Sequence, residues 1–380
     1  MNNLHISLTE FRNESRVLKE VDSISSLQYM QHVYIASLHG SGLSIAEKLS
    51  GKISLKRMIL KTRILNKGLF AQIIKYIEFS LKVFFYYRNK NIDLINIHSL
   101  GLLPLGYFLK IFYKARLIYD THELETETNG LNGLRKKLAK IIERFLIDKV
   151  DHIFVVSENI ADWYQKKYGI QRPTVVMNAP KSYTVENNQY FRNKFELRED
   201  QLIVLYQGGL APGRGIDLLL ETFSLRTDDK VIIVFMGYGV LEKLIQDTAD
   251  KYNTVFFHKA VQPKDLLNYT ASADIGISPI SNTCLSYYFC MPNKLFEYAM
   301  AGLPVLVSNM KEMREFVEKY RIGWVIEDET IDSINQAIDK IVGSDMRKFK
   351  NNARLAALEN AWEHQALKML VDYNFLLGGK

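Results

Sequence analysis

Two successive runs of alternating strand-like and helix-like segments constrain the fold of this chain more than any other feature. In the first half, short apolar runs such as 92–98 and 152–157 alternate with segments of helical periodicity. The alternation breaks in the polar stretch 178–200 and resumes at 202–206. Strands that alternate with helices form parallel sheets covered on both faces, so the sequence predicts two doubly wound, Rossmann-like α/β domains.

The polar break sets the expected domain boundaries. We place a first domain at 1–180, a linker at 181–200 and a second domain at 201–360, with a final helix at 361–380. A chain of 380 residues is long enough to bury two cores of ordinary size. Doubly wound sheets bind ligands at the carboxyl ends of their strands, so we expect the site in a cleft between the two sheets.

The composition excludes several classes of protein. The N-terminus lacks the basic start and apolar core of a signal peptide, and no apolar run reaches the ~18 residues that cross a bilayer. Cys284 and Cys290 are too few for a disulfide framework or a metal site, and they fit a reducing compartment. We therefore expect a cytoplasmic protein without a metal site, either soluble or peripheral on the inner membrane face.

Positive charge is concentrated in the first half of the chain. The net charge is +7, but residues 1–180 hold 26 Lys and Arg against 16 Asp and Glu. Between 51 and 90 there are ten basic residues and a single acid, Glu78, beside apolar residues at helical spacing. The pattern indicates either a basic amphipathic surface for anionic lipid or a solvated helix face over the domain core. Nucleic acid is not an expected partner, because no recognition motif accompanies the charge.

The stretch 291–308 contains the clearest candidate site. Pro292 and Asn293 are start signals for a short helix, and its first N–H groups, including those of Asn293 and Leu295, are expected to point at a ligand. Lys294 adds a positive charge, which predicts an anion such as phosphate. Glu297 lies one turn further on and can accept two sugar or ribose hydroxyls. The alternative is an exposed Lys294–Glu297 pair on an ordinary helix.

A glycine-rich loop in the same half is the second candidate. Gly208, Gly209 and Arg214 follow a predicted strand and precede a predicted helix, where backbone N–H groups and a guanidinium can bind phosphate oxygens. A plain strand-to-helix turn would explain the glycines equally well. The combination with Lys294 about eighty positions later favours a phosphate site.

The run P-N-K-L-F-E-Y-A-M-A-G-L-P-V at 292–305 resembles the donor-binding signature of the retaining glycosyltransferases of family 4, which have the two-domain GT-B fold. Glu297 matches the second glutamate of that signature, whereas Phe289 stands where most members carry the first. The resemblance implies that Lys294 and Arg214 contact the leaving diphosphate. It also implies that the final helix packs back on the first domain, and that two loops border the nucleotide base, with the residues Gly237, Gly239, Lys259 and Val261.

The first domain extends this resemblance. Tyr119-Asp-Thr-His-Glu123 is similar to a D-x-H-E motif of the same branch, which implies that His122 lines the sugar site and makes Glu123 a further candidate. Asn13 and Arg16 replace the glycine-rich first loop of many members. They are candidates for the acceptor side, with surface charge as the open alternative.

The sequence therefore predicts a metal-independent glycosyltransferase. The expected donor is a nucleotide-diphosphate sugar, with UDP or GDP preferred, and no separate cofactor is expected. The expected acceptor is a saccharide, linked to lipid in a bacterial envelope-glycan pathway. Two alternatives stay open: a non-catalytic GT-B partner subunit, and another GT-B enzyme such as a sugar-nucleotide epimerase or a phosphorylase. The sequence does not define the oligomeric state.

Overall fold

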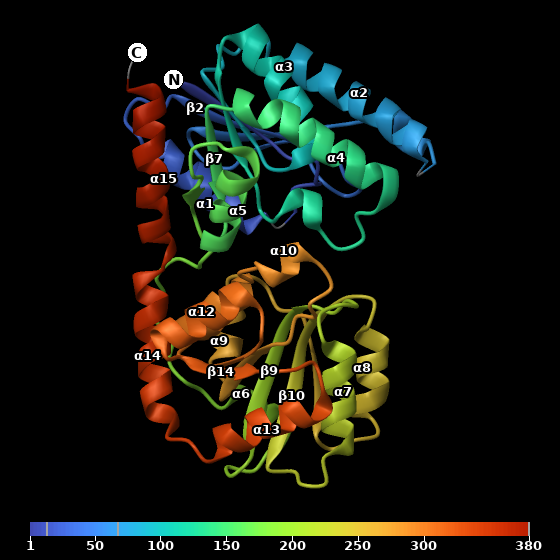
Figure 1. The fold of residues 1–380 in the computed structure, drawn as a ribbon, viewed down its shortest axis with the longest axis vertical. Helices are drawn as coiled ribbons and strands as arrows, with labels where there is room; N and C mark the ends of the chain where they lie inside the picture. Colours follow the sequence, from blue (N-terminus) through green and yellow to red (C-terminus); the bar gives the residue numbers. More distant parts are fainter. Residues whose placement is uncertain (13, 67, 379–380) are drawn as a thin grey trace. The chain divides into compact units, whose positions relative to one another are not determined.

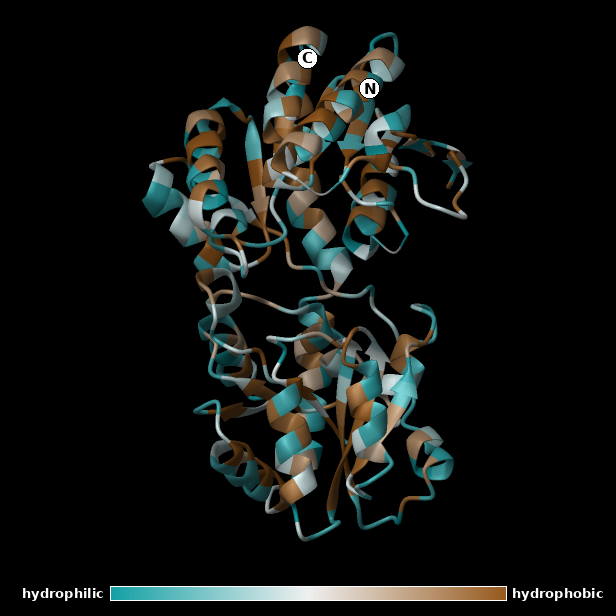
Figure 2. Cartoon of the chain, turned by 90° about the vertical axis from the view of Figure 1, so that its right-hand side faces the viewer, coloured by the Kyte–Doolittle hydropathy of each residue, from teal (hydrophilic) through white to brown (hydrophobic). Residues whose placement is uncertain are grey.

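The chain forms two compact α/β units (Figure 1). The computed structural model describes residues 1–12, 14–66 and 68–378. The first unit comprises Met1–Val176 and Ala366–Lys380, and the second comprises Met177–Gln365. Hydrophobic residues are concentrated in the strands, whereas the helices carry mixed colouring along their length (Figure 2). This is the distribution that a sheet buried between amphipathic helices requires.

The first unit is built on an eight-stranded sheet of order β3-β4-β2-β1-β5-β6-β7-β8. All neighbouring strands run parallel except β3, which pairs antiparallel with β4 at the edge. The strands are β1 Asn2–Ile6, β2 His32–Leu38, β3 Ala46–Lys48, β4 Ile53–Met58, β5 Leu94–Ile97, β6 Arg116–Asp120, β7 His152–Val155 and β8 Thr174–Val175. The β3–β4 pair lies in a region where the sequence predicted no strands, because its strands are short and polar on one face.

Helices cover both faces of this sheet. They are α1 Ser15–Ser25, α2 Leu69–Tyr87, α3 Leu103–Tyr113, α4 Gly133–Leu146 and α5 Glu158–Tyr168, with short 3-10 helices η1 Lys61–Ile64, η2 Leu100–Leu102, η3 Glu125–Glu127 and η4 Ile147–Lys149. The C-terminal part of α15 Trp362–Leu377 also belongs to this unit. Its Tyr373 is fully buried, and the Tyr373 hydroxyl accepts a 2.5 Å hydrogen bond from Asn96 on β5.

The second unit has a six-stranded, entirely parallel sheet of order β11-β10-β9-β12-β13-β14. The strands are β9 Leu202–Gly209, β10 Val231–Tyr238, β11 Val255–Lys259, β12 Ile275–Ser278, β13 Val305–Ser308 and β14 Gly323–Ile326. Separate hydrophobic cores cover its two faces. The strand order changes direction between β9 and β12, which is the point where such sheets bind ligands.

The first helix of the second unit lies in the stretch 181–200, where the sequence predicted a linker. The helices of this unit are α6 Tyr190–Lys194, α7 Ile216–Leu225, α8 Glu242–Ala249, α9 Leu266–Thr270, α10 Leu285–Tyr288, α11 Asn293–Met300, α12 Lys311–Tyr320, α13 Ile331–Val342 and α14 Met346–Glu359. The stretch 181–200, expected as a linker, lies inside this unit, since Phe191 of α6 is fully buried in its core. Across the described ranges of the chain, no helix is both long and apolar enough to span a bilayer.

Candidate active site

The carboxyl end of β9 provides the first part of the site in the second unit. The strand ends in Gly208 and Gly209, which are exposed, and Gly208 has a φ of +114°. The loop then reaches Gly215, the N-cap of α7, with a φ of +69°. A side chain at Gly215 would overlap the carbonyl oxygen of Pro279. The glycine at 215 is therefore required by backbone geometry and packing, and it fixes the position of the preceding Arg214.

A Gly215→Ala substitution tests this packing. We expect it to destabilise the second unit by about 2–4 kcal/mol and to weaken anion binding at Arg214, because both the φ value and the overlap with Pro279 disfavour a Cβ atom. The matched control is Gly302→Ala, where φ is +75° but nothing lies within 4 Å of an added Cβ. Urea unfolding of the two variants should show the larger loss for Gly215→Ala; equal losses would contradict the packing argument.

Helix α11 brings Lys294 to the end of β9. The Lys294 ammonium lies 3.7 Å from the centroid of the Tyr206 ring, and the side chain passes beside Gly208. Among the residues that the structure describes, Lys294 makes no hydrogen bond or ion pair, and the same holds for Arg214. The Arg214 guanidinium stacks 5.3 Å from the Tyr287 ring centroid. Two cations that lie on aromatic rings and make no ion pair among the described residues form a site for an anion.

The electrostatics of Lys294 support the same conclusion. Burial, together with the positive charge of Arg214, lowers the pKa of Lys294 to about 7, although Glu297 acts in the opposite direction. Burial also raises the pKa of the neighbouring Cys290 thiol to about 12, so this group stays neutral. An ordinary surface lysine would show no such effect. The geometry is that of a cationic site suited to an anion.

Hydrogen bonds fix Glu297 against β9. Gln207 donates from Nε2 to a Glu297 carboxylate oxygen at 2.7 Å and accepts from Thr270 at 2.7 Å. The Gln207 backbone N–H donates to the hydroxyl of Tyr298 at 3.0 Å, and that hydroxyl donates to the carbonyl of Ile277 at 3.1 Å. The second half of α11 is thus held to β9 and β12. Glu297 is oriented by partners in the sheet, which an exposed Lys294–Glu297 pair would not require.

The other predicted binding residues of this unit divide into two groups. Gly237 of β10 is paired in register with Gly208 of β9. A Cβ atom at position 237 would overlap the Gly208 carbonyl oxygen, so glycine is required there. Gly239 is required for the same reason against Leu210. Lys259 ends β11 and is exposed, whereas Val261 packs on the core. These two glycines are thus explained by chain packing without a ligand.

The prediction for Leu295 needs correction. Its side chain is fully buried, and its backbone N–H donates to the carbonyl of Pro292 at 3.0 Å. That N–H was expected to point at a ligand, but the first turn of α11 uses it internally. Asn293, at the start of α11, is exposed.

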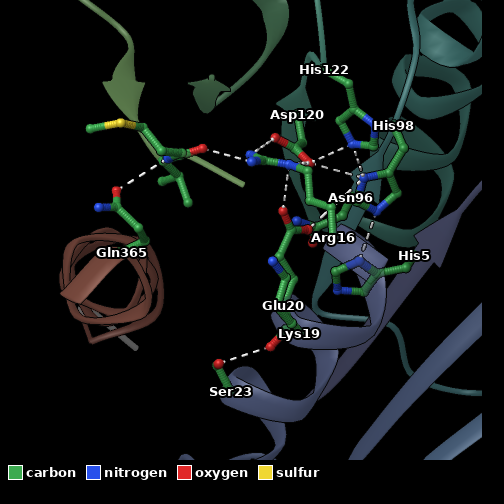
Figure 3. A network of polar contacts seen from close by, with 12 residues as sticks. His5, Arg16, Lys19, Glu20, Ser23, Asn96, His98, Asp120, His122 and Gln365 are labelled. Carbon is green, nitrogen blue, oxygen red and sulfur yellow. Dashed lines mark hydrogen bonds and ion pairs between the residues drawn. The ribbon is translucent and has the colours of Figure 1, made fainter. Parts of the chain in front are cut away.

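The carboxyl edge of the first sheet carries a buried network around His122 (Figure 3). His122 Nε2 and His98 Nδ1 each lie 3.0 Å from the same carboxylate oxygen of Asp120. On its other side, His98 Nε2 lies 2.9 Å from Nδ1 of His5. Arg16 donates to both Asp120 oxygens, at 3.0 and 2.6 Å. The His122 side chain keeps 32% exposure, so it is the surface end of the network.

The charges of this network follow from burial. Burial opposes ionisation of Asp120, but Arg16 and His122 hold the pKa of that carboxyl well below its usual range. Burial lowers the pKa of His98 and His5, so both imidazoles are neutral. Burial and the Asp120 charge raise the pKa of Glu20 well above its usual range. From these partners we assign N–H to His122 Nε2, which leaves Nδ1 as the acceptor on the partly exposed side.

One prediction for the acceptor side, Arg16, changes in this structure. Arg16 was expected to meet a substrate, but only 4% of its side chain is exposed, and Asp120, Glu20 and the Val176 carbonyl bind it. It is an interior counter-ion, since a buried guanidinium requires such partners. Asn13 lies outside the described residues. Glu123 is exposed after β6, where its carbonyl accepts a hydrogen bond from Thr121.

The network also contains side chains that could coordinate a metal ion. One ligand atom each from His98, Asp120 and His122 lie within 4.8 Å of one another, as do those of His5, Glu20 and His98. Arg16 already neutralises the shared carboxylate, so an ion there would lie against a guanidinium. The sequence reasoning missed His5, His98 and Gln207. Their one common signal was position, because each lies in or just after a strand of the parallel sheets.

Two Rossmann-like units, one with a cationic pocket at its carboxyl edge, are the architecture of the GT-B glycosyltransferases. Residues 187–356 match the family model "Glycosyl transferases group 1", and residues 31–179 match "Glycosyltransferase Family 4". The chain therefore belongs to the family 4 type of GT-B glycosyltransferases. The prediction of fold and family is confirmed.

Individual relatives are distant. The chain is 25% identical over 256 residues to the teichuronic acid biosynthesis glycosyltransferase TuaH of Bacillus subtilis, covering 65% of this chain and 64% of that protein. It is 27% identical over 260 residues to the lipopolysaccharide 1,2-N-acetylglucosaminetransferase of Salmonella typhimurium, covering 63% and 66%. Each match spans under two-thirds of the relative's own length.

Solved structures show the same fold at low identity. The sucrose-phosphate synthase of Thermosynechococcus elongatus superposes with a TM-score of 0.82 at 17% identity, over 100% of both chains. Anabaena Alr3699/HepE, solved in complex with UDP, gives a TM-score of 0.74 at 13% identity, over 98% of this chain and 100% of that one.

Proposed function

We propose that this protein transfers a sugar from a nucleotide-diphosphate donor to a hydroxyl group of a saccharide acceptor, with retention of anomeric configuration. The observation that carries the proposal is the pair Arg214 and Lys294 at the carboxyl edge of the second sheet, two cations that make no ion pair in the described part of the chain. The α- and β-phosphates of the donor would occupy this pocket. Catalysis then consists of stabilising the negative charge that develops on the leaving diphosphate.

The other residues have positioning roles in this proposal. Glu297, oriented by Gln207, accepts the two ribose hydroxyls of the donor. His122 contacts the transferred sugar or the acceptor through Nδ1, since Nε2 is held by Asp120. Glu123 is a second candidate on the acceptor side. Because protein cations neutralise the diphosphate, the proposed reaction needs no metal and no further cofactor.

The acceptor and the location are part of the same proposal. Two relatives are named for teichuronic acid and lipopolysaccharide synthesis, and both names refer to bacterial envelope glycans. We infer a lipid-linked saccharide acceptor in such a pathway, and a cytoplasmic enzyme that works peripherally on the inner face of the membrane. The UDP complex of one structural neighbour favours UDP over GDP as the donor nucleotide.

Calorimetric titration with UDP, GDP and ADP in the presence of a chelator tests the donor site. We expect one nucleotide, UDP first, to bind with a Kd on the order of 1–100 μM, corresponding to about 5–8 kcal/mol. Once the base is known, a panel of its sugar conjugates can be screened, and NMR of the product will show whether the anomeric configuration is retained. If none of the three nucleotides binds, the chain is better explained as a non-catalytic GT-B partner subunit.

A further inference from the structure

Three neighbouring helices of the first unit expose apolar side chains in regular stripes. On α2 the stripe is Phe70, Ile73, Ile77, Leu81 and Phe85, and on α4 it is Leu134, Leu138, Ile141 and Phe145. On α3, Phe108, Ile111 and Phe112 are exposed. The spacing of three and four places each set on one side of its helix, yet that side does not face the protein core. Phe145 retains 71% and Phe70 77% exposure.

The three helices are neighbours in the first unit, and we call their exposed apolar stripes together the α2–α4 face. The Phe84 ring of α2 lies 5.4 Å from the ring centroids of both Phe108 and Phe112. The Tyr113 hydroxyl of α3 donates to the Phe84 carbonyl at 2.8 Å. Helices α3 and α4 are in contact, and Figure 1 shows the three helices next to one another. Soluble proteins rarely leave a patch of this extent uncovered.

The charge on the α2–α4 face is strongly one-sided. The three helices contain eight Lys and Arg against two acids, Glu78 and Glu143. Neither acid offers negative charge to a partner, because Glu78 pairs with Lys82 and Glu143 is buried under three tyrosine hydroxyls. In the described part of the chain, the exposed Arg135, Lys137 and Arg144 of α4 have no ion pair. These charges remain available to an anionic partner.

We propose that the α2–α4 face docks on the surface of an anionic phospholipid bilayer. The aromatic and aliphatic stripes enter the boundary between headgroups and acyl chains, while the basic residues of α4 bind lipid phosphates. A protein partner would need a complementary surface both strongly acidic and apolar, whereas an anionic bilayer offers both properties along its whole area. The inference deepens the proposed function, since it places the enzyme where a lipid-linked acceptor resides.

Vesicle flotation tests the docking surface with the full chain. We expect binding to vesicles of phosphatidylcholine with about one-third phosphatidylglycerol to exceed binding to phosphatidylcholine alone at least tenfold, and to fall with added salt. Phe145→Asp should lower this binding at least tenfold, whereas Leu355→Asp on α14, at 66% exposure, should not. The double variant Arg135→Glu/Lys137→Glu should also lower vesicle binding. The control double variant Lys243→Glu/Lys348→Glu, in the second unit, should leave vesicle binding unchanged.

Three outcomes would overturn the docking proposal. Equal binding to the two vesicle types is one, and equal effects of the test and control variants are another. The third is a dimer in solution that Phe145→Asp dissociates, because the face would then be covered by a second copy of the chain. Nucleotide titration of each variant separates this proposal from the donor site: loss of vesicle binding with unchanged nucleotide affinity concerns the docking face alone.

Discussion

Replacing Lys294 with methionine is expected to weaken nucleotide binding at least about a hundredfold while making the empty protein more stable. A charged hydrogen bond to phosphate in a desolvated pocket contributes about 3 kcal/mol, and each 1.4 kcal/mol is a factor of ten. The same ammonium is unfavourable in the protein without nucleotide, because burial and Arg214 lower its pKa to about 7. Methionine is also unbranched and is one heavy atom shorter than lysine, and it removes the ammonium that lies over the Tyr206 ring.

The sign of the stability effect follows from the pKa. Because the folded-state pKa of about 7 lies below the ordinary lysine value of 10.5, the unfolded chain binds more protons between these two pH values. The penalty of the Lys294 charge is therefore complete below pH 7 and declines as the pH rises toward 10.5. Urea unfolding at pH 6 should show a gain on the order of 2–4 kcal/mol for Lys294→Met, and a much smaller gain at pH 10.

Proton uptake gives a second measurement on the same residue. At pH 8 a lysine with a pKa of about 7 is about nine-tenths neutral, and binding of the diphosphate would restore its charge. Wild-type protein should thus take up close to one proton per nucleotide at pH 8 and almost none at pH 6. Calorimetry in buffers of different ionisation enthalpy measures this uptake, which Lys243→Met should leave unchanged. If the Lys294→Met variant still binds nucleotide tightly, Lys294 is not part of the donor site.

The structure shows why the fold could be predicted better than the site. Strands such as β9 and β10 are buried on both faces and read as continuous apolar runs, so composition alone located them. Helix α11 begins at Asn293, where Pro292 and Asn293 predicted a helix start. The prediction of a linker at 181–200 was wrong, because one buried residue, Phe191, anchors an otherwise polar segment in the core.

The site residues that the sequence could not provide are those whose roles depend on distant partners. Arg16 is separated from Asp120 by 104 positions, and nothing local distinguishes it from the exposed Arg12 nearby. His5 and His98 are 93 positions apart and meet only because β1 and β5 are neighbours in the sheet. Lys294 and Glu297 could be found because one helix turn presents both, which is local information.

Asp120 is expected to be the most sensitive position for the stability of the first unit. Asp120→Ala would leave the Arg16 guanidinium, with 4% of its side chain exposed, without its principal counter-ion. Removing one partner of a buried ion pair costs about 3–5 kcal/mol. His122 and His98 would also lose the carboxylate that binds both imidazoles, so glycosyl transfer should fall at least about a hundredfold even where the variant is folded.

Hydrogen exchange read by mass spectrometry can measure the Asp120→Ala effect on each unit separately. We expect faster exchange in α1, β5 and β6 and unchanged exchange in the second unit. Asp229→Ala is the matched control, because its pair with Arg198 is exposed and should contribute under about 1 kcal/mol. Glu20→Gln should cost less than Asp120→Ala, since burial and the Asp120 charge raise the pKa of Glu20 and make it the weaker counter-ion of Arg16. If Asp120→Ala costs no more than Asp229→Ala, the network around His122 is not held together by the Arg16–Asp120 pair.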